Sequence, residues 1–224
     1  MIQLLEVGFK YPTGEFRLTI PELSVADGEK VAVIGPSGSG KTTLLNLVAG
    51  ILTPDNGSLT IAGTQLDVAA DQARRDFRIT TIGFIFQDFG LIDYLDVLDN
   101  ILHPYRITSS LTLTSDVRKR AAELAEQLGV GARVTHFPDA LSHGERQRVA
   151  ICRALLPAPK IILADEATGN LDPDNKELIL EAMFEAVSRH ETTLVAVTHD
   201  HELLDRFDRV IDFKEFLDRD REAT

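Results

Sequence analysis

The sequence predicts an α/β protein in which helices cover a parallel sheet. Short apolar runs, typical of buried strands, alternate with segments of helical pattern, as they do in strand–helix–strand units. The middle of the chain has a mostly helical pattern, which predicts a helical insertion between two halves of that sheet. The composition, 44% hydrophobic and 26% charged, supplies a sizeable core and excludes global disorder. A length of 224 residues fits one such domain, or two small lobes that share a core.

The apolar runs and helical patterns locate the main elements. Buried strands are expected at residues 31–34, 82–86, 161–164 and 194–198. Helices are expected at residues 42–49, where Gly50 can end the helix, and at 117–128 and 174–189. The first 34 residues read as short strands separated by turns, and residues 88–157 as mostly helical. The tail, 212–224, mixes acidic and basic residues and is expected to be a short exposed helix or a frayed end.

The charge balance limits the partners of the protein. Lys and Arg total 23 while Asp and Glu total 35, which gives a net charge of −12. Binding to DNA, RNA or anionic lipid headgroups needs an excess of cations that neutralise phosphates, so no direct nucleic-acid partner is expected. A small local phosphate site is still compatible with this charge.

Cysteine content and apolar stretches indicate the compartment. The single cysteine, Cys152, excludes an intrachain disulfide and a cysteine-based zinc site, and its surroundings favour a buried apolar role over a catalytic thiol. No signal peptide is visible, and the longest apolar runs fall far short of the ~20 residues that cross a bilayer. We therefore expect a cytoplasmic protein that reaches a membrane only through a partner.

The first motif with chemical meaning is a phosphate-binding loop at residues 35–42. Its letters, GPSGSGKT, match the pattern G-x-x-x-x-G-K-[ST]. Glycines let backbone N–H groups point at phosphate oxygens, and the following helix adds its positive dipole end. Lys41 is expected to reach the β- and γ-phosphates, and the Thr42 hydroxyl to bind Mg²⁺. The alternative is a Gly/Ser loop without a ligand, but the strand before it and the helix after it favour phosphate binding.

The second motif is an apolar strand, 160–164, that ends in two carboxylates. In a protein with a phosphate loop, such a strand places Asp165 beside the water shell of Mg²⁺. Glu166 then lies near the γ-phosphate, where a carboxylate can orient or deprotonate an attacking water. The alternative is an ordinary strand end with two solvated acids.

The third motif, LSHGERQR at residues 141–148, can be explained in two ways that are compatible. Ser142 and Glu145 form S-x-x-E, a capping box that opens a helix running towards Leu156. A helix N-terminus with an exposed serine hydroxyl and the amide of Gly144 is also an anion site.

These motifs, in this order, resemble the ATP-binding-cassette (ABC) ATPases over nearly the whole chain. In that family an aromatic residue stacks on adenine, and Tyr11 is its best match, with Phe9 and Phe16 as close competitors. The family's glutamine after a strand is matched by Gln87 and its switch histidine by His199. The remaining matches are the signature segment 141–145, the acidic pair 165–166 and the dimer-interface loop 169–172.

The resemblance implies a fold and a set of site residues. The fold is a P-loop NTPase (RecA-like) core with an antiparallel β subdomain and an inserted α-helical subdomain, in which residues 1–87 and 157–224 form the core and 88–156 the helical part. Catalytic roles are implied for Lys41, Gln87, Glu166 and His199. Nucleotide contacts are implied for Tyr11, Gly35, Pro36, Ser37, Gly38, Ser39, Gly40, Lys41, Thr42, Thr43, Ser142, Gly144 and Asp172. Binding of Mg²⁺ is implied for Thr42, Gln87 and Asp165.

The resemblance also implies a mechanism and its partners. Two such subunits pair head to tail, and each ATP lies between the phosphate loop of one and the signature segment of the other. Hydrolysis opens this homodimer, and the helical insertion passes the motion through Gln87 to transmembrane permease subunits at the inner face of the cell membrane. The difference between ATP and ADP contacts is then the energy source of a conformational cycle.

The stretches 145–151, 163–166 and 168–172 are similar to the lipoprotein-release, macrolide-export and cell-division branch of the family. This similarity implies export or extraction of a lipoprotein or amphiphile. An alternative is a non-transport ATPase that regulates cell-wall or division enzymes through a membrane partner. A DNA-repair or chromosome ATPase is disfavoured by the charge of −12 and the lack of a coiled-coil insertion. A small-molecule kinase would need no signature segment.

The signature segment departs from the family pattern at His143, where glycine is usual, and Ala167 stands where proline is usual. Ser142 and Gly144 are retained, so contact with the γ-phosphate should survive. His143 is either a proton-linked contact that strengthens ATP-driven dimerisation at lower pH, or a tolerated substitution that points into solvent.

Overall fold

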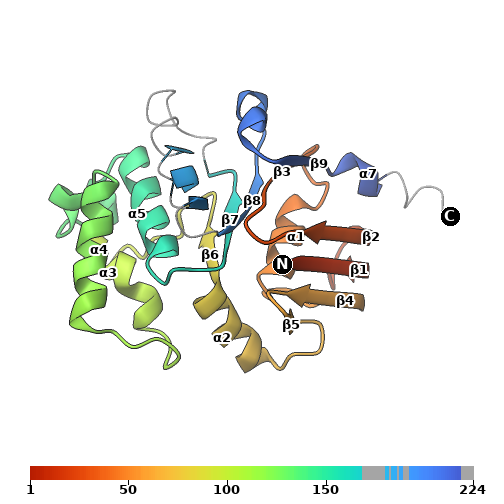
Figure 1. Cartoon of the computed structure of the whole chain (residues 1–224), viewed down its shortest axis with the longest axis horizontal. Coiled ribbons are helices and arrows are strands. Elements are labelled where there is room, and N and C mark those ends of the chain that lie inside the picture. Colours follow the sequence, from red (N-terminus) through yellow and green to blue (C-terminus); the bar gives the residue numbers. More distant parts are fainter. Residues whose placement is uncertain (168–179, 182, 186, 189–191, 218–224) are drawn as a thin grey trace.

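Two sheets organise the computed structural model, which describes residues 1–167, 180–181, 183–185, 187–188 and 192–217 (Figure 1). The parallel sheet has the order β6-β7-β8-β3-β9. Its strands are β3 (Lys30–Ile34), β6 (Ile82–Ile85), β7 (Ile161–Asp165), β8 (Thr193–Val197) and β9 (Arg209–Asp212). The antiparallel sheet has the order β2-β1-β4-β5. Its strands are β1 (Ile2–Lys10), β2 (Arg17–Val25), β4 (Asn56–Ile61) and β5 (Thr64–Gln65).

Helices lie on both sides of the parallel sheet. The α-helices are α1 (Lys41–Val48), α2 (Asp71–Thr81), α3 (Val97–Leu102), α4 (Ser115–Gln127), α5 (His143–Leu155) and α7 (Lys214–Leu217). The 3-10 helices are η1 (His103–Tyr105), η2 (Gly131–Arg133), η3 (Pro138–Ala140) and η4 (His201–Arg206). Figure 1 shows α3, α4 and α5 grouped on one side of the sheet, and α1 beside the antiparallel sheet on the other.

Both faces of the parallel sheet are buried at its central strands β3, β7 and β8, because successive residues of these strands point to opposite cores. One row across the sheet, formed by Ala164, Ala196 and Ala32, faces a core shared with α3, α4 and α5. The next row faces a second core, which is shared with α1 and the antiparallel sheet. Because all five strands are parallel, their carboxyl ends meet at one edge of the sheet.

The expected α/β class is confirmed, and so are the expected strands and the helices at 42–49 and 117–128. The helices α3, α4 and α5 come between β6 and β7 in the chain, as the predicted insertion requires. The expected helix at 174–189 lies largely outside the described residues, although Leu180 and Met183 are buried in the core that contains α5. Cys152 is fully buried, as expected, and burial raises the pKa of its thiol.

The prediction that the tail is exposed is wrong for its first part. A short helix, α7, is present, but Phe213, directly before it, and Phe216, within it, are 0% and 8% exposed. Their rings pack against each other in the core next to α1 and the antiparallel sheet. Two aromatic residues gain several kcal/mol by such burial, which outweighs the charges beside them in the sequence.

Candidate nucleotide-binding site

The phosphate loop joins β3 to α1 and depends on its glycines. Gly35, Gly38 and Gly40 all have positive φ, at 146°, 77° and 101°. A Cβ at Gly35 would lie 2.9 Å from Phe213 Cβ, and one at Gly40 would lie 2.9 Å from Phe16 Cζ. The loop therefore packs closely against Phe213 and Phe16, and a residue with a side chain does not fit at Gly35 or Gly40.

The loop holds a buried cation and an unsatisfied hydroxyl. Lys41 is 5% exposed, and its Nζ donates to the carbonyl oxygens of Gly35, at 2.9 Å, and Pro36, at 2.8 Å. Burial lowers the pKa of this ammonium. The Oγ of Ser39 is buried and has no hydrogen-bond partner in the part of the chain that the structure describes. A donor set of this kind fits a phosphate group, which supplies the missing acceptors and a compensating charge.

Thr42 and Asp165 meet beside this loop. The Thr42 side chain hydrogen-bonds the carboxyl group of Asp165, which is 7% exposed at the end of β7. Burial raises the pKa of Asp165, and the hydrogen bond from Thr42 opposes this rise. A hydroxyl and a carboxylate are oxygen ligands of the kind that Mg²⁺ prefers. The described residues contain no cluster of three or more metal-binding side chains, so a magnesium ion here would complete its shell with phosphate oxygens and water.

Three predicted catalytic residues converge at the ends of neighbouring strands. Gln87 follows β6, Glu166 follows β7 and His199 follows β8. The amide Nε2 of Gln87 donates to Glu166 Oε2 at 3.1 Å, and His199 Nε2 lies 2.6 Å from Glu166 Oε1. The backbone of Glu166 is left-handed, with φ of 48°, and its N–H donates to Val197 O at 3.1 Å. Such a conformation is unfavourable for a residue with a side chain and is common at functional sites.

Of the three aromatic candidates for adenine stacking, Tyr11 has the most suitable environment. Its ring is 37% exposed, whereas Phe9 is 8% exposed and belongs to the core. The Tyr11 hydroxyl lies 3.1 Å from Thr43 Oγ1, which joins it to the first turn of α1. Phe16 packs against the same core and supports the Tyr11 ring, with their centroids 5.8 Å apart.

The signature segment forms the predicted capping box at the start of α5. Ser142 Oγ accepts from the N–H of Glu145 at 3.3 Å, and Glu145 Oε2 accepts from the N–H of Ser142 at 2.8 Å. The N–H of Ser142 and the Arg133 side chain, 2.9 Å from Glu145 Oε1, lower the pKa of Glu145. The backbone of Gly144 is buried and the Ser142 side chain is exposed.

The structure separates this segment from the phosphate loop. The helix α5 packs in the core on one side of the parallel sheet, and α1 packs on the other side. Ser142 and Gly144 are thus not brought together with Lys41 and Thr42 within one chain. Asp172 and the rest of the interface loop, 169–172, lie outside the described residues.

His143 does not simply point into solvent. It is exposed in the first turn of α5, and its ring packs edge-on against Phe89, with centroids 4.6 Å apart at 80°. Its linkage to protons stays a prediction. The sequence patterns did not single out Phe89 or its partner Arg153, which lies at the far end of α5. An arginine in a helix is normally predicted to be exposed to solvent.

The capping box is expected to contribute to the free energy of unfolding. We expect Glu145→Ala to lower the free energy of unfolding at pH 7 by about 1 kcal/mol, because the hydrogen bond from the N–H of Ser142 to the Glu145 carboxylate and the contact with Arg133 are lost. Since the folded-state pKa of Glu145 is lowered, its contribution is complete above the ordinary pKa and disappears as the pH falls through the lowered value. Urea unfolding at several pH values measures this.

The matched control is Glu123→Ala, which removes an exposed carboxylate paired with Lys119 on α4. Its expected cost is about 0.3 kcal/mol. Equal urea midpoints for wild type and Glu145→Ala at pH 7 would show that the capping box does not stabilise α5.

A glycine-rich loop between a parallel strand and a helix, with acids at the end of another strand of the same sheet, defines the class of P-loop nucleotide-binding proteins. A family model described as ABC transporter matches residues 18–169. The chain therefore belongs to the ABC transporter family, and it is an ATPase of that family.

Individual relatives agree with this membership. The chain is 40% identical over 212 residues to the lipoprotein-releasing system ATP-binding protein LolD of Nitrobacter hamburgensis, with 93% of this chain and 90% of the relative covered. It is 40% identical over 220 residues to the macrolide export ATP-binding/permease protein MacB of Rhodopirellula baltica, covering 97% of this chain and 32% of the relative. A solved dimeric structure of the ATP-binding cassette MJ0796, bound to ADP and Pi, superposes with a TM-score of 0.86 at 34% identity, covering 95% of this chain and 94% of that one. The resemblance to ABC ATPases of the lipoprotein-release and macrolide-export branch is thereby confirmed.

Proposed function

We propose that the chain is the ATP-hydrolysing subunit of a membrane exporter or extractor whose cargo is a lipoprotein or a similar amphiphile. The observation that carries the proposal is the convergence of Gln87, Glu166 and His199 beside the phosphate loop. The cargo class is supported by the relative named as a lipoprotein-releasing ATP-binding protein, of which 90% is covered. In this proposal residues 1–87 and 157–224 form the nucleotide-binding core, and residues 88–156 form the helical subdomain.

Each residue of the site has a definite task in this proposal. Lys41 leaves the carbonyls of its own loop and binds the β- and γ-phosphates, while Thr42 and Asp165, with Gln87, hold Mg²⁺. The magnesium ion supplies charge neutralisation for the phosphates. Glu166 accepts a proton from the attacking water, and His199 keeps this carboxylate in place through the contact at 2.6 Å.

A second copy of the chain completes the site. Ser142 and Gly144 lie in the helical layer that faces away from the phosphate loop of their own chain. In a head-to-tail homodimer these groups, together with the N-terminal dipole of α5, reach the γ-phosphate bound by the other copy. The dimer described for the similar cassette MJ0796 supports this arrangement, and we assign Asp172 to the same interface.

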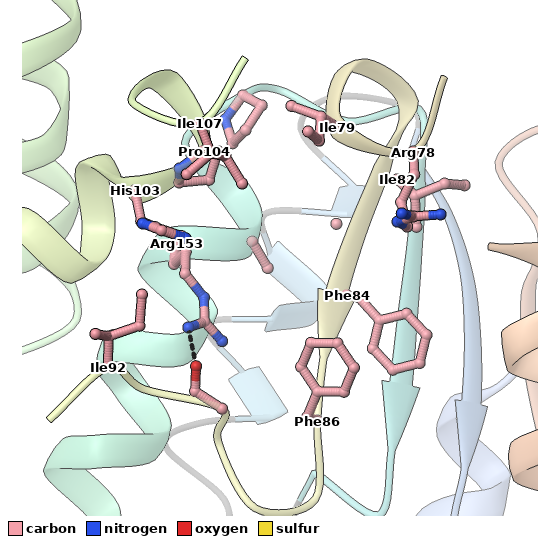
Figure 2. Close-up of a pocket in the computed structure, with 14 residues that line it drawn as sticks. Arg78, Ile79, Ile82, Phe84, Phe86, Ile92, His103, Pro104, Ile107 and Arg153 are labelled. Atoms are coloured by element: carbon pink, nitrogen blue, oxygen red, sulfur yellow. Dashed lines mark hydrogen bonds between the residues drawn. The ribbon is translucent and has the colours of Figure 1, made fainter. Parts of the chain in front are cut away.

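A groove of about 350 Å³ suits the membrane partner (Figure 2). It lies between β6 and the helical layer, and Figure 2 shows Phe84 and Phe86 on one wall with Pro104 and Ile107 at its upper rim. We propose that a cytoplasmic segment of the permease docks there. The support is the MacB relative, whose name combines an ATP-binding part with a permease and of which this chain covers 32%. The described residues contain no helix that is long and apolar enough to cross a membrane, so attachment at the inner membrane face would depend on this partner.

Reconstitution with the permease tests the proposed function. Proteoliposomes that contain both proteins and a fluorescent lipoprotein should release the lipoprotein to a soluble acceptor only when MgATP is present. ATP turnover without release, accompanied by activation of a cell-wall hydrolase, would instead support a regulatory role.

The adenine contact predicts a selective loss of affinity. We expect Tyr11→Ala to raise the Kd for MgATP by about 10-fold, because stacking of a base on an aromatic ring is worth about 1–3 kcal/mol. Affinity for inorganic tripolyphosphate, which has no base, should not change. The control Tyr11→Phe keeps the ring and loses only the contact with Thr43. An equal loss for both ligands in Tyr11→Ala would exclude the stacking role.

A further inference from the structure

Arg153 is a buried cation with an unusual pair of partners. It lies near the end of α5 and is 9% exposed. Its Nη2 donates to Phe89 O at 2.6 Å. Its Nη1 donates to Gly90 O, and Figure 2 draws this second hydrogen bond as a dashed line. Burial lowers the pKa of the guanidinium to about 10, and the charge of Asp88 opposes this fall. A buried cation is stable only when its donors are satisfied, so these two carbonyls are essential to its placement.

The loop that Arg153 holds has a strained backbone. Phe89 and Gly90 are consecutive left-handed residues, with φ of 65° and 54°. For Phe89 this conformation costs about 1 kcal/mol or more, so other contacts must stabilise it. Two contacts from α5 do so: the guanidinium binds the loop's carbonyls, and the His143 ring packs against the buried Phe89 ring.

This loop carries Gln87 at its other end. Gln87 lies two residues before Phe89, and its amide donates to the carboxylate of Glu166. On the N-terminal side, Phe86 is fixed by stacking on Phe84, with centroids 4.2 Å apart. The segment between is short, so a change at the Phe89 and Gly90 carbonyls moves the Gln87 amide relative to Glu166.

We propose that Arg153 is a positioning residue for ATP hydrolysis. By binding the carbonyl oxygens of Phe89 and Gly90, it keeps the Gln87 amide within hydrogen-bonding distance of the Glu166 carboxylate. The inference rests on the proposed roles of Gln87 and Glu166. Arg153 touches no reacting group itself, so its removal should slow turnover and leave nucleotide binding intact.

The primary test is the steady-state kinetics of purified variants. Arg153→Met keeps the aliphatic stem and removes all donors, so kcat should fall by about 10-fold while the KM and Kd for MgATP change less than about 2-fold. Arg153→Lys, whose ammonium still donates to a carbonyl, should recover part of kcat. If Arg153→Met does not fold, the comparison of Arg153→Lys with the wild type is used instead. The control Arg209→Met removes a guanidinium that also bonds a backbone carbonyl, that of Ser24, and should keep wild-type kcat.

A double-mutant cycle with Gln87→Ala separates positioning from general destabilisation. If Arg153 acts through Gln87, Arg153→Met lowers kcat by less than about 2-fold in the Gln87→Ala background. A second full 10-fold loss there, or unchanged kcat in both Arg153 variants, overturns the inference while leaving the catalytic role of Glu166 intact. Unchanged kcat in Gln87→Ala alone overturns both this inference and the proposed role of Gln87.

Discussion

Replacing Glu166 by Gln should reduce phosphate release from MgATP by a factor on the order of 10² or more. The amide keeps the size of the side chain and can still bond Gln87 and His199, so the ends of β6, β7 and β8 stay together. What is lost is the basic carboxylate that accepts a proton from the attacking water. The Kd for MgATP should remain close to the wild-type value, because Lys41 and Thr42 are untouched.

The matched control for this result is Glu22→Gln, at an exposed position on β2. It should hydrolyse ATP at the wild-type rate. Wild-type turnover in Glu166→Gln would assign water activation to another group, and His199 would be the next candidate because it contacts the same carboxylate.

The second large effect is expected at Lys41. We expect Lys41→Ala to raise the Kd for MgATP by about 100-fold or more, because each charge-assisted hydrogen bond to a phosphate is worth about 1.5–3 kcal/mol. The substitution also leaves the carbonyls of Gly35 and Pro36 without their present donor. Calorimetric titration measures the loss, and urea unfolding checks that the variant is folded.

Lys119→Ala is the control for lost positive charge, since this side chain is 78% exposed on α4. Unchanged affinity in Lys41→Ala, with Lys119→Ala also unchanged, would exclude residues 35–42 as the phosphate-binding loop.

The structure brings the predicted phosphate loop and the predicted catalytic residues to one edge of the parallel sheet, and their roles stay predictions. The phosphate loop needs only a strand, a run of glycines and a helix, all adjacent in the sequence. Glu166 was singled out by its strand end, and Gln87 and His199 by the resemblance to ABC ATPases. Each follows a parallel strand, and the carboxyl ends of such strands share one edge of the sheet. Their mutual contacts at 3.1 Å and 2.6 Å follow from that arrangement.

Contacts between distant segments were not predictable in the same way. Nothing near Phe213 in the sequence indicates that this residue packs against Gly35, and nothing near Arg153 indicates its hydrogen bonds to Phe89 and Gly90. Such pairs depend on how layers pack rather than on local periodicity. The helix α2 was also not predicted from the sequence; none of its residues is buried.

We expect ATP to join two copies of this chain and its hydrolysis to separate them. Sedimentation velocity of the Glu166→Gln protein measures this association, because slow hydrolysis preserves the ATP-bound state. The protein should sediment as a monomer without nucleotide and with MgADP, and as a dimer with MgATP. A monomer under saturating MgATP, or the same dimer with MgADP, would contradict the account.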